Sequence, residues 1–214
     1  YNLYTMLCDQ ENYKGCREQA MMLRDGYDDK IFGEFYISEI SPMEQAQKLL
    51  FITCENDDLQ ACIEYGEMLE QGQGIVSDIP KAQELFEDLC NEGAFLACTR
   101  LGQSYQREYQ KLKLTHSDKE LALRQNQGRN PDVASLFLYE RACANGDQEG
   151  CAELGRLHEL GIAVPQDFTK AFGLYESTCQ QQTATGCYEL GEIYELGQSV
   201  VPNQVLAETL YKQS

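Results

Sequence analysis

The sequence predicts an all-α fold: a right-handed α/α superhelical solenoid of about five disulfide-bridged helix-turn-helix repeats, followed by a C-terminal helix. Three observations predict it. All ten cysteines fall into pairs separated by eight residues, and the pairs recur with an underlying period of 36 residues. Apolar and small residues also recur at fixed helical offsets from the pairs. Recurrence of this kind is typical of repeat proteins, in which each unit packs only on its neighbours.

Every cysteine of the chain belongs to a pair separated by eight residues. The pairs are Cys8/Cys16, Cys54/Cys62, Cys90/Cys98, Cys143/Cys151 and Cys179/Cys187. The chain has no C-x-x-C motif and only two histidines. Zinc sites and thioredoxin-like redox sites are therefore disfavoured, because both use more closely spaced ligands. We expect five local disulfides, no metal, no cofactor and an oxidising compartment.

The spacing of the pairs defines the repeats. Successive first cysteines lie 46, 36, 53 and 36 residues apart, so insertions of 10 and 17 residues interrupt a period of 36. We expect one domain with insertions at 27–40 and 108–130. Its expected repeats cover residues 1–26, 41–72, 78–107, 131–161 and 167–197, with a final helix at 203–214.

Other residues fall into columns when the chain is aligned on the cysteines. Four residues before the first cysteine stands a large apolar residue: Tyr4, Leu50, Phe86, Tyr139 and Tyr175. Four residues after the second cysteine stands a small residue: Ala20, Gly66, Gly102, Gly155 and Gly191. Offsets of three, four and seven residues share one helix face, so two amphipathic helices flank each pair.

Helix ends are marked in the same register. Glycine stands ten residues after the second cysteine in four repeats, where a helix would end in a left-handed cap: Gly26, Gly72, Gly161 and Gly197. Asp78, Asp167 and Asn203 suit the N-cap of the next helix, and Ser41 and Asn130 do so directly before a proline. The first cysteine then ends one helix and the second begins the next, within the reach of a disulfide.

The pattern A-x-x-L-[YF]-x-x-x-C-x7-C-x-x-L-G-x-x-[YH]-x-x-G resembles the Sel-one-like repeat family, relatives of the tetratricopeptide repeats. The stretches AFGLYESTC (171–179) and GCYELGEIYELG (186–197) fit best, and the likeness covers nearly the whole chain. Ala20 and Glu108 depart from it, since both stand where glycine is expected. The resemblance implies the cysteine-rich bacterial type, whose members mostly act as adaptors and scaffolds.

Composition excludes some partners. The formal net charge is -18, from 35 acidic and 17 basic residues. Binding to nucleic acid or to an anionic membrane surface needs a basic surface, so neither is expected. No apolar run is long enough for a membrane span. We expect another protein, basic in character, as the partner of a chain that is monomeric when free.

The two insertions break the repeat pattern and are candidates for individual function. The first carries Phe32, Phe35 and Tyr36, which either pack on the solenoid or form a partner-binding patch. The second, counted from Arg107 to Asn130, is net +3 and includes Lys111, Lys113 and Arg124, while the rest of the chain is net -21. A capping box at Ser117–Glu120 predicts a short helix there, which either leans on an acidic repeat or docks an acidic ligand.

Catalytic motifs are absent from the sequence. It has no G-x-S-x-G, H-E-x-x-H, S-x-x-K or phosphate-binding glycine loop. His158 stands where other repeats carry leucine or tyrosine, so we expect it to pack in the core. No pair of carboxylates stands out, because acidic residues are common throughout the chain.

Three function classes remain. The first is a non-enzymatic protein-binding module of the bacterial cell envelope, periplasmic or secreted. Its specific form would be an immunity or inhibitor protein that neutralises a basic toxic effector, since opposite charge favours fast association. The second, a β-lactam-binding or weakly hydrolytic protein, is implied by some cysteine-rich relatives. The third is a structural scaffold of the envelope.

Overall fold

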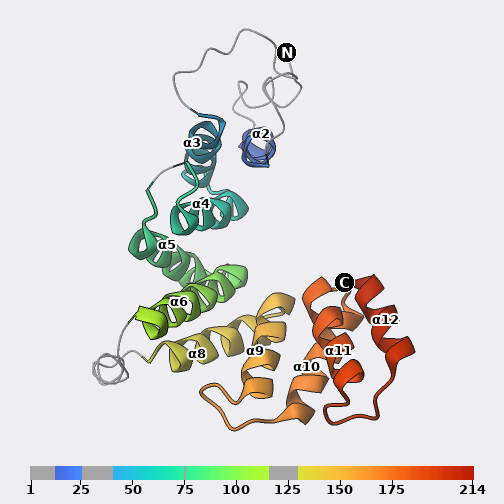
Figure 1. The fold of residues 1–214 in the computed structure, drawn as a ribbon. Helices are drawn as coiled ribbons and strands as arrows, with labels where there is room; N and C mark the ends of the chain where they lie inside the picture. Colours follow the sequence, from blue (N-terminus) through green and yellow to red (C-terminus); the bar gives the residue numbers. More distant parts are fainter. Residues whose placement is uncertain (1–12, 26–40, 75, 116–129) are drawn as a thin grey trace. The chain divides into compact units, whose positions relative to one another are not determined.

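The computed structural model describes residues 13–25, 41–74, 76–115 and 130–214, and all regular structure in these ranges is helical. The chain divides into two compact units, residues 1–89 and 90–214. Helices follow one another as antiparallel neighbours in each unit (Figure 1). The predicted all-α repeat architecture is therefore confirmed.

The helices come in pairs joined by a short turn at the cysteines. The first unit contains α2 and α3, which pack together, then α4 and most of α5. In the second unit α6 packs on α8, α8 on α9, α9 on α10, α10 on α11 and α11 on α12. The bounds are α2 Tyr13–Arg24, α3 Pro42–Cys54, α4 Leu59–Gln71, α5 Ile79–Asn91, α6 Phe95–Thr115, α8 Pro131–Ala144, α9 Gln148–Leu160, α10 Phe168–Gln180, α11 Ala184–Leu196 and α12 Gln204–Gln213.

The predicted caps explain where these helices start and stop. α4, α9 and α11 end at Gly72, Gly161 and Gly197, whose φ values of 70°, 67° and 72° lie in the left-handed region. That conformation costs glycine little, because it has no β-carbon. The expected N-caps accept hydrogen bonds from the first helical turns: Ser41, Asp78, Asn130, Asp167 and Asn203.

Four disulfides clamp the turns between paired helices. Their Cα–Cα distances run from 4.4 to 4.8 Å, and each closes a separation of eight residues. In the chain-entropy model a loop of this length stabilises the fold by about 2–3 kcal/mol per bridge. The bonds are Cys54–Cys62, Cys90–Cys98, Cys143–Cys151 and Cys179–Cys187. Cys8 lies outside the described residues, so its pairing with Cys16 stays a prediction.

An aromatic ring lies on a helical glycine at each of four repeat junctions. A β-carbon built on Gly155 would lie only 2.7 Å from Cε1 of Tyr175 on the next helix. Such a contact is shorter than real β-carbons make, so only glycine lets the ring approach. We call this the ring-on-glycine contact, and it recurs as Phe86 on Gly66, Tyr139 on Gly102, Tyr175 on Gly155 and Tyr211 on Gly191.

The first repeat departs from this rule in both columns at once. Ala20 stands at the glycine position and Leu50 at the ring position, and both are fully buried. α2 and α3, which carry them, pack on each other. A leucine side chain needs less clearance than a ring, so alanine is tolerated at this junction.

One helix is longer than expected. α6 continues to Thr115, past the predicted end of its repeat at Arg107. The position that holds a capping glycine in four repeats is Glu108 here, and glutamate favours helix continuation. Residues 108–115 of the expected insertion are therefore helical, whereas the short helix predicted from the capping box lies outside the described residues.

The disulfide assignment predicts a simple chemical result. Alkylation of the unreduced, denatured protein should add no label, and alkylation after reduction should label all ten cysteines in the chain. Intact mass before and after reduction measures both numbers. A labelled pair in the unreduced sample would contradict the five-bridge assignment, and peptide mapping would show whether it is the Cys8/Cys16 pair.

Candidate functional site

The second helix of four repeats carries a row of polar residues at the second, fifth and eighth positions after its second cysteine. We call this row the polar stripe. Residues three apart on a helix are neighbours on its surface, so each row forms a continuous strip. The stripes are Glu64, Glu67 and Glu70 on α4; Arg100, Gln103 and Gln106 on α6; Glu153, Arg156 and Glu159 on α9; and Glu189, Glu192 and Glu195 on α11.

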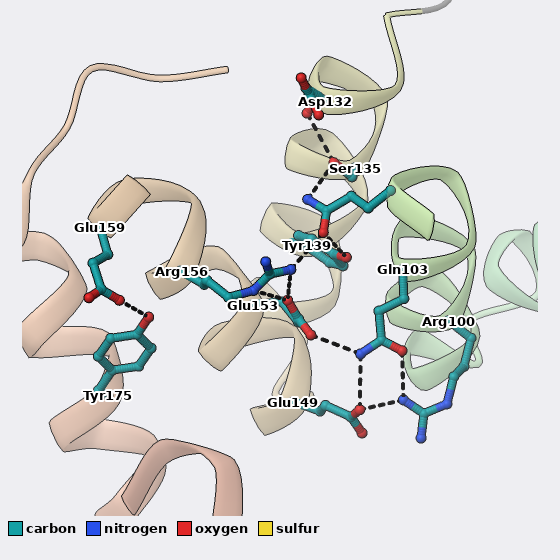
Figure 2. Close-up of polar contacts among 11 residues, drawn as sticks. Arg100, Gln103, Asp132, Ser135, Tyr139, Glu149, Glu153, Arg156, Glu159 and Tyr175 are labelled. Atoms are coloured by element: carbon teal, nitrogen blue, oxygen red, sulfur yellow. Dashed lines mark hydrogen bonds and ion pairs between the residues drawn. The ribbon is translucent and has the colours of Figure 1, made fainter. Parts of the chain in front are cut away.

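The stripe of α6 is joined to α9 by charged and amide hydrogen bonds (Figure 2). Arg100 forms an ion pair with Glu149 at the start of α9. Gln103 Nε2 donates to Glu149 Oε1 at 3.2 Å and to Glu153 Oε1 at 3.0 Å. The carboxylates of α9 are thus held by an arginine and an amide of the preceding second helix.

Arg156 extends the same network. Its Nη2 donates to Gln106 Oε1 on α6 at 2.6 Å and to Glu153 Oε2 on its own helix at 2.7 Å. Its Nε also donates to Glu153 Oε2, at 2.9 Å. This guanidinium is therefore engaged on both helices (Figure 2).

The ring-on-glycine tyrosines are tied to the eighth stripe position of the preceding repeat. Tyr175 Oη donates to Glu159 Oε2 at 2.9 Å, and Tyr211 Oη donates to Glu195 Oε2 at 2.6 Å. Burial raises the pKa of Tyr175, so its hydroxyl stays protonated and available as a donor. The junctions of Tyr175 and Tyr211 therefore combine a ring seated on glycine with a hydroxyl bound to the stripe.

The residue directly after the second cysteine also reaches the following repeat. Arg17 Nη1 donates to both carboxylate oxygens of Asp58, at 3.0 and 3.1 Å. Thr99 Oγ1 donates to Asp147. Asp58 and Asp147 are the N-caps of α4 and α9, so one carboxylate both starts a helix and binds the preceding repeat. These two caps were not among the N-caps predicted from the sequence.

The stripe of α11 is wholly acidic, as is the stripe of α4. Glu189 is half-buried, and its pKa is raised to about 7 by burial first, then by the neighbouring carboxylates of Glu192 and Glu159. The positive charge of Arg156 offsets part of this rise in the pKa of Glu189. Within the described ranges no ion pair is formed by Glu189, Glu192 or Glu195. Among the described residues, Arg156 therefore acts on the α11 stripe at longer range, without an ion pair.

Of the residues predicted to bind a partner, the described structure includes Lys111 and Lys113. Lys111 and Lys113 are exposed on the extended end of α6, where Lys113 Nζ lies 4.6 Å from the ring centroid of Tyr109. Phe32, Phe35, Tyr36 and Arg124 lie outside the described residues, so their role stays a prediction.

A sequence pattern marks two of the stripes, but it is hard to recognise because acidic residues are common throughout the chain. The segments EYGEMLE (64–70) and ELGEIYE (189–195) share the pattern E-x-G-E-x-x-E. The glycine in it is the seat of the next ring, and the acids are the stripe. Alignment on the cysteines could have separated these acids from the rest of the acidic surface.

His158 packs inside the protein, as expected. It is 6% exposed, and neither ring nitrogen has a hydrogen-bond partner in the described structure. Burial lowers its pKa, so the ring is neutral at pH 7. A search of the described residues also found no group of three or more potential ligands placed to hold a metal ion.

Comparison with known families identifies the repeat. A family model described as the Sel1 repeat matches residues 59–93, 126–147, 148–182 and 184–214. The chain belongs to the Sel1 repeat family. The matched stretches contain the stripes of α4, α9 and α11, and the stripe of α6 lies between two of them. No curated protein sequence matches the chain.

Solved structures show the same Sel1 repeat fold at low identity. A Sel1 repeat protein from Oxalobacter formigenes aligns over 98% of this chain and 73% of its own, with a TM-score of 0.71 and 18% identity. A protective antigen of uropathogenic Escherichia coli with an SLR fold gives 0.59 and 19%, over 99% of this chain and 39% of its own. An immunity protein from Pseudomonas aeruginosa gives 0.53 and 17%, over 91% and 64%. This chain thus spans well under half of the E. coli protein.

The raised pKa of Glu189 predicts a pH-dependent stability. Its folded-state pKa of about 7 lies above the ordinary value of 4.5, so the folded protein holds this proton more tightly than the unfolded chain does. The resulting stabilisation is complete below pH 4.5 and is lost as the pH rises through 7. Glu189→Gln should therefore stabilise the protein by about 1–3 kcal/mol at pH 8 and by little at pH 4.

Thermal unfolding at several pH values measures this difference. Glu176→Gln is the matched control, because it removes the same charge from an exposed position on α10. The effect of Glu176→Gln on the free energy of unfolding should not change as the pH passes through 7. Equal pH profiles for the two variants would contradict the assignment of the raised pKa to Glu189.

Proposed function

We propose that this Sel1 repeat protein is a non-enzymatic binding module of the bacterial cell envelope that neutralises a basic effector protein. The observation that carries the proposal is the acidic stripe of α11, whose three glutamates lie on a disulfide-braced helix pair and form no ion pair within the described chain. Stacked helix pairs of this kind offer extended surfaces suited to another protein. The net charge of -18 favours rapid association with a positively charged partner.

The solved relatives support the specific form of the proposal. One of them is an immunity protein from Pseudomonas aeruginosa, and another is a protective antigen of uropathogenic Escherichia coli. Their identities to this chain are 17% and 19%, so they support the scaffold and suggest the role. Inhibition of an effector is one function that a rigid binding surface can perform without chemistry of its own.

The disulfides support a periplasmic location. Four are present in the described structure, and bonds of this kind form and persist in oxidising compartments. No helix in the described part of the chain is long and apolar enough to cross a membrane. We place the protein in the periplasm or outside the cell.

The polar groups of the repeat junctions favour binding over catalysis. Arg156, Glu153 and Gln106 are committed to hydrogen bonds with one another. His158, the histidine within the described residues, is buried and neutral, which removes it from contact with a substrate. A general acid or base must instead reach the substrate directly or through one water.

Affinity capture tests the proposal. The immobilised protein should retain one basic protein from a periplasmic and secreted extract, and the complex should weaken by at least tenfold between 50 and 500 mM salt. Adding this protein should abolish the retained protein's toxic activity. An unrelated protein of similar acidity and size, immobilised at the same density, is the control for nonspecific charge.

Two results would overturn the proposal. One is retention of the same proteins by the acidic control. The other is steady turnover of a β-lactam by the pure protein, lost on substitution of a defined residue, which would favour the enzymatic alternative.

A further inference from the structure

The turn between α8 and α9 contains the one asparagine–glycine pair of the sequence, Asn145 and Gly146. The turn lies between Cys143 and Cys151, whose bridge holds the two helix ends at a Cα–Cα distance of 4.5 Å. Asn145 is exposed to solvent. The backbone nitrogen of a glycine is uncrowded, because glycine has no β-carbon. The Gly146 nitrogen can therefore approach the side-chain amide of Asn145 more easily than that of a larger residue could.

Attack of that nitrogen converts asparagine into aspartate or isoaspartate. The Gly146 N–H gives its proton to hydroxide, and the nitrogen forms a bond to Cγ of Asn145. The Cγ–Nδ2 bond breaks, and Nδ2 leaves as ammonia with a proton from water, which restores the hydroxide. Water then opens the five-membered imide at either of its carbonyl carbons. The net reaction is hydrolysis of one amide, so it consumes only water.

The folded turn holds both reacting groups back. Gly146 N donates to Cys143 O at 3.0 Å, and Asn145 Nδ2 donates to Arg141 O at 2.8 Å. The first hydrogen bond retains the proton that must be lost, and the second directs the side-chain amide back along α8. The nitrogen can attack Cγ only after both bonds have broken and the amide has turned toward it. The reactive form is therefore an opened turn.

The Cys143–Cys151 bridge suppresses this opening. It ties the end of α8 to the start of α9, so the turn between them cannot separate its ends. Exposed turns are among the segments that open most easily in a folded protein. In the chain-entropy model a local bridge disfavours such open states. Loss of this bridge would thus raise the fraction of molecules in which Asn145 can react.

A second turn of the chain provides an internal control. Asn56 Nδ2 donates to the carbonyl four residues earlier at 2.7 Å, and Asp57 N donates to the carbonyl three residues earlier at 3.0 Å. Asp57 and Gly146 both have positive φ, of 66° and 91°. The two turns therefore have the same hydrogen bonds, but the aspartate side chain crowds the attacking nitrogen. Asn56 should react more slowly than Asn145 when its turn opens.

The product of the reaction cannot rebuild the native turn. A carboxylate in place of the Asn145 amide has no N–H for Arg141 O, and its charge lies at the C-terminal end of α8, where the helix dipole disfavours it. Isoaspartate also adds one carbon to the backbone. Asp147, two residues further on, caps α9 and accepts a hydrogen bond from Thr99 on α6. The modification would thus weaken a turn that also holds the junction between α6 and α9.

We propose that Asn145 is a site of spontaneous deamidation that the Cys143–Cys151 bridge suppresses. Breakage of the bridge opens the turn, and the reaction then converts this opening into a permanent change of charge and backbone. The inference is independent of the proposed function, because it concerns the chemical lifetime of the fold and not the partner.

Three proteins test the suppression by the bridge: the unaltered chain, Cys143→Ala/Cys151→Ala and Cys54→Ala/Cys62→Ala. Each is incubated at mildly alkaline pH, and peptide mapping follows the mass gain at Asn145. Circular dichroism checks that each variant keeps its helical content. Loss of the local bridge should accelerate deamidation of Asn145 roughly tenfold or more. Loss of the distant bridge should leave this rate within roughly twofold of that in the unaltered chain.

Gly146→Asp tests whether the reaction passes through the Gly146 nitrogen. The variant recreates the turn of the second repeat, in which Asp57 adopts the same positive φ. Combined with Cys143→Ala/Cys151→Ala, it should slow deamidation of Asn145 roughly fivefold or more, because a side chain now crowds the nitrogen. An unchanged rate would show direct hydrolysis of the amide and would overturn the proposed route.

Two other results would overturn the inference. One is a rate at Asn145 in the native, unaltered chain that equals its rate after unfolding in guanidinium, because the folded turn would then give no protection. The other is equal acceleration in the two folded bridge variants, because general loss of stability would then explain the reaction without a local role for the bridge.

A further variant keeps the test decisive if the chain without the Cys143–Cys151 bridge does not fold. Asp57→Gly places an asparagine–glycine pair in the equivalent turn of the second repeat. Asn56 of this variant should deamidate slowly while its own bridge is intact, and roughly tenfold faster or more after Cys54→Ala/Cys62→Ala. Equal rates with and without that bridge would contradict the inference.

Discussion

The ring-on-glycine contact is the interaction on which the rest of the repeat structure depends. It sets how closely one repeat approaches the next, because Tyr175 lies where a β-carbon on Gly155 would have to be. That approach brings the tyrosine hydroxyl to Glu159 and places the polar stripes of neighbouring helices within hydrogen-bonding distance. The disulfides act within a repeat, whereas this contact acts between repeats. Both are needed for a rigid surface.

The polar stripes lie next to these contacts, and their charges and hydrogen bonds differ from one repeat junction to the next. Between α6 and α9, Arg100 pairs with Glu149, Gln103 donates to Glu149, and Arg156 donates to Gln106. On α11, as on α4, these positions hold glutamates, and the pKa of Glu189 is raised by burial first and then by the neighbouring carboxylates. Most of the 35 acidic residues can thus serve solubility, while the stripes hold some of them at fixed positions on the second helices.

The fold could be predicted from the sequence because the same residue pattern recurs in successive repeats. The cysteine spacing, the capping glycines and the two columns of ring and small residue were all visible. The contacts that these residues make could not be predicted. Periodicity shows which residues share a helix face, but it does not show which residue of the next repeat they contact. The stripes were missed because their glutamates do not differ in type from the surrounding acids. Asp58 and Asp147 were not predicted as caps. Their second role, binding the preceding repeat, can be recognised only in the packed structure.

A double-mutant cycle at Gly155 and Tyr175 tests the central claim most directly. Gly155→Ala should destabilise the protein by about 1–3 kcal/mol, because the added methyl group collides with the ring. Gly173→Ala, where a β-carbon would meet nothing within 4 Å, should be neutral or stabilise by about 0.5–1 kcal/mol. Combining Gly155→Ala with Tyr175→Leu recreates the Ala20 and Leu50 pair of the first repeat. Its cost, from chemical denaturation, should fall at least 1 kcal/mol below the sum of the single costs. A harmless Gly155→Ala with strictly additive costs would contradict the account.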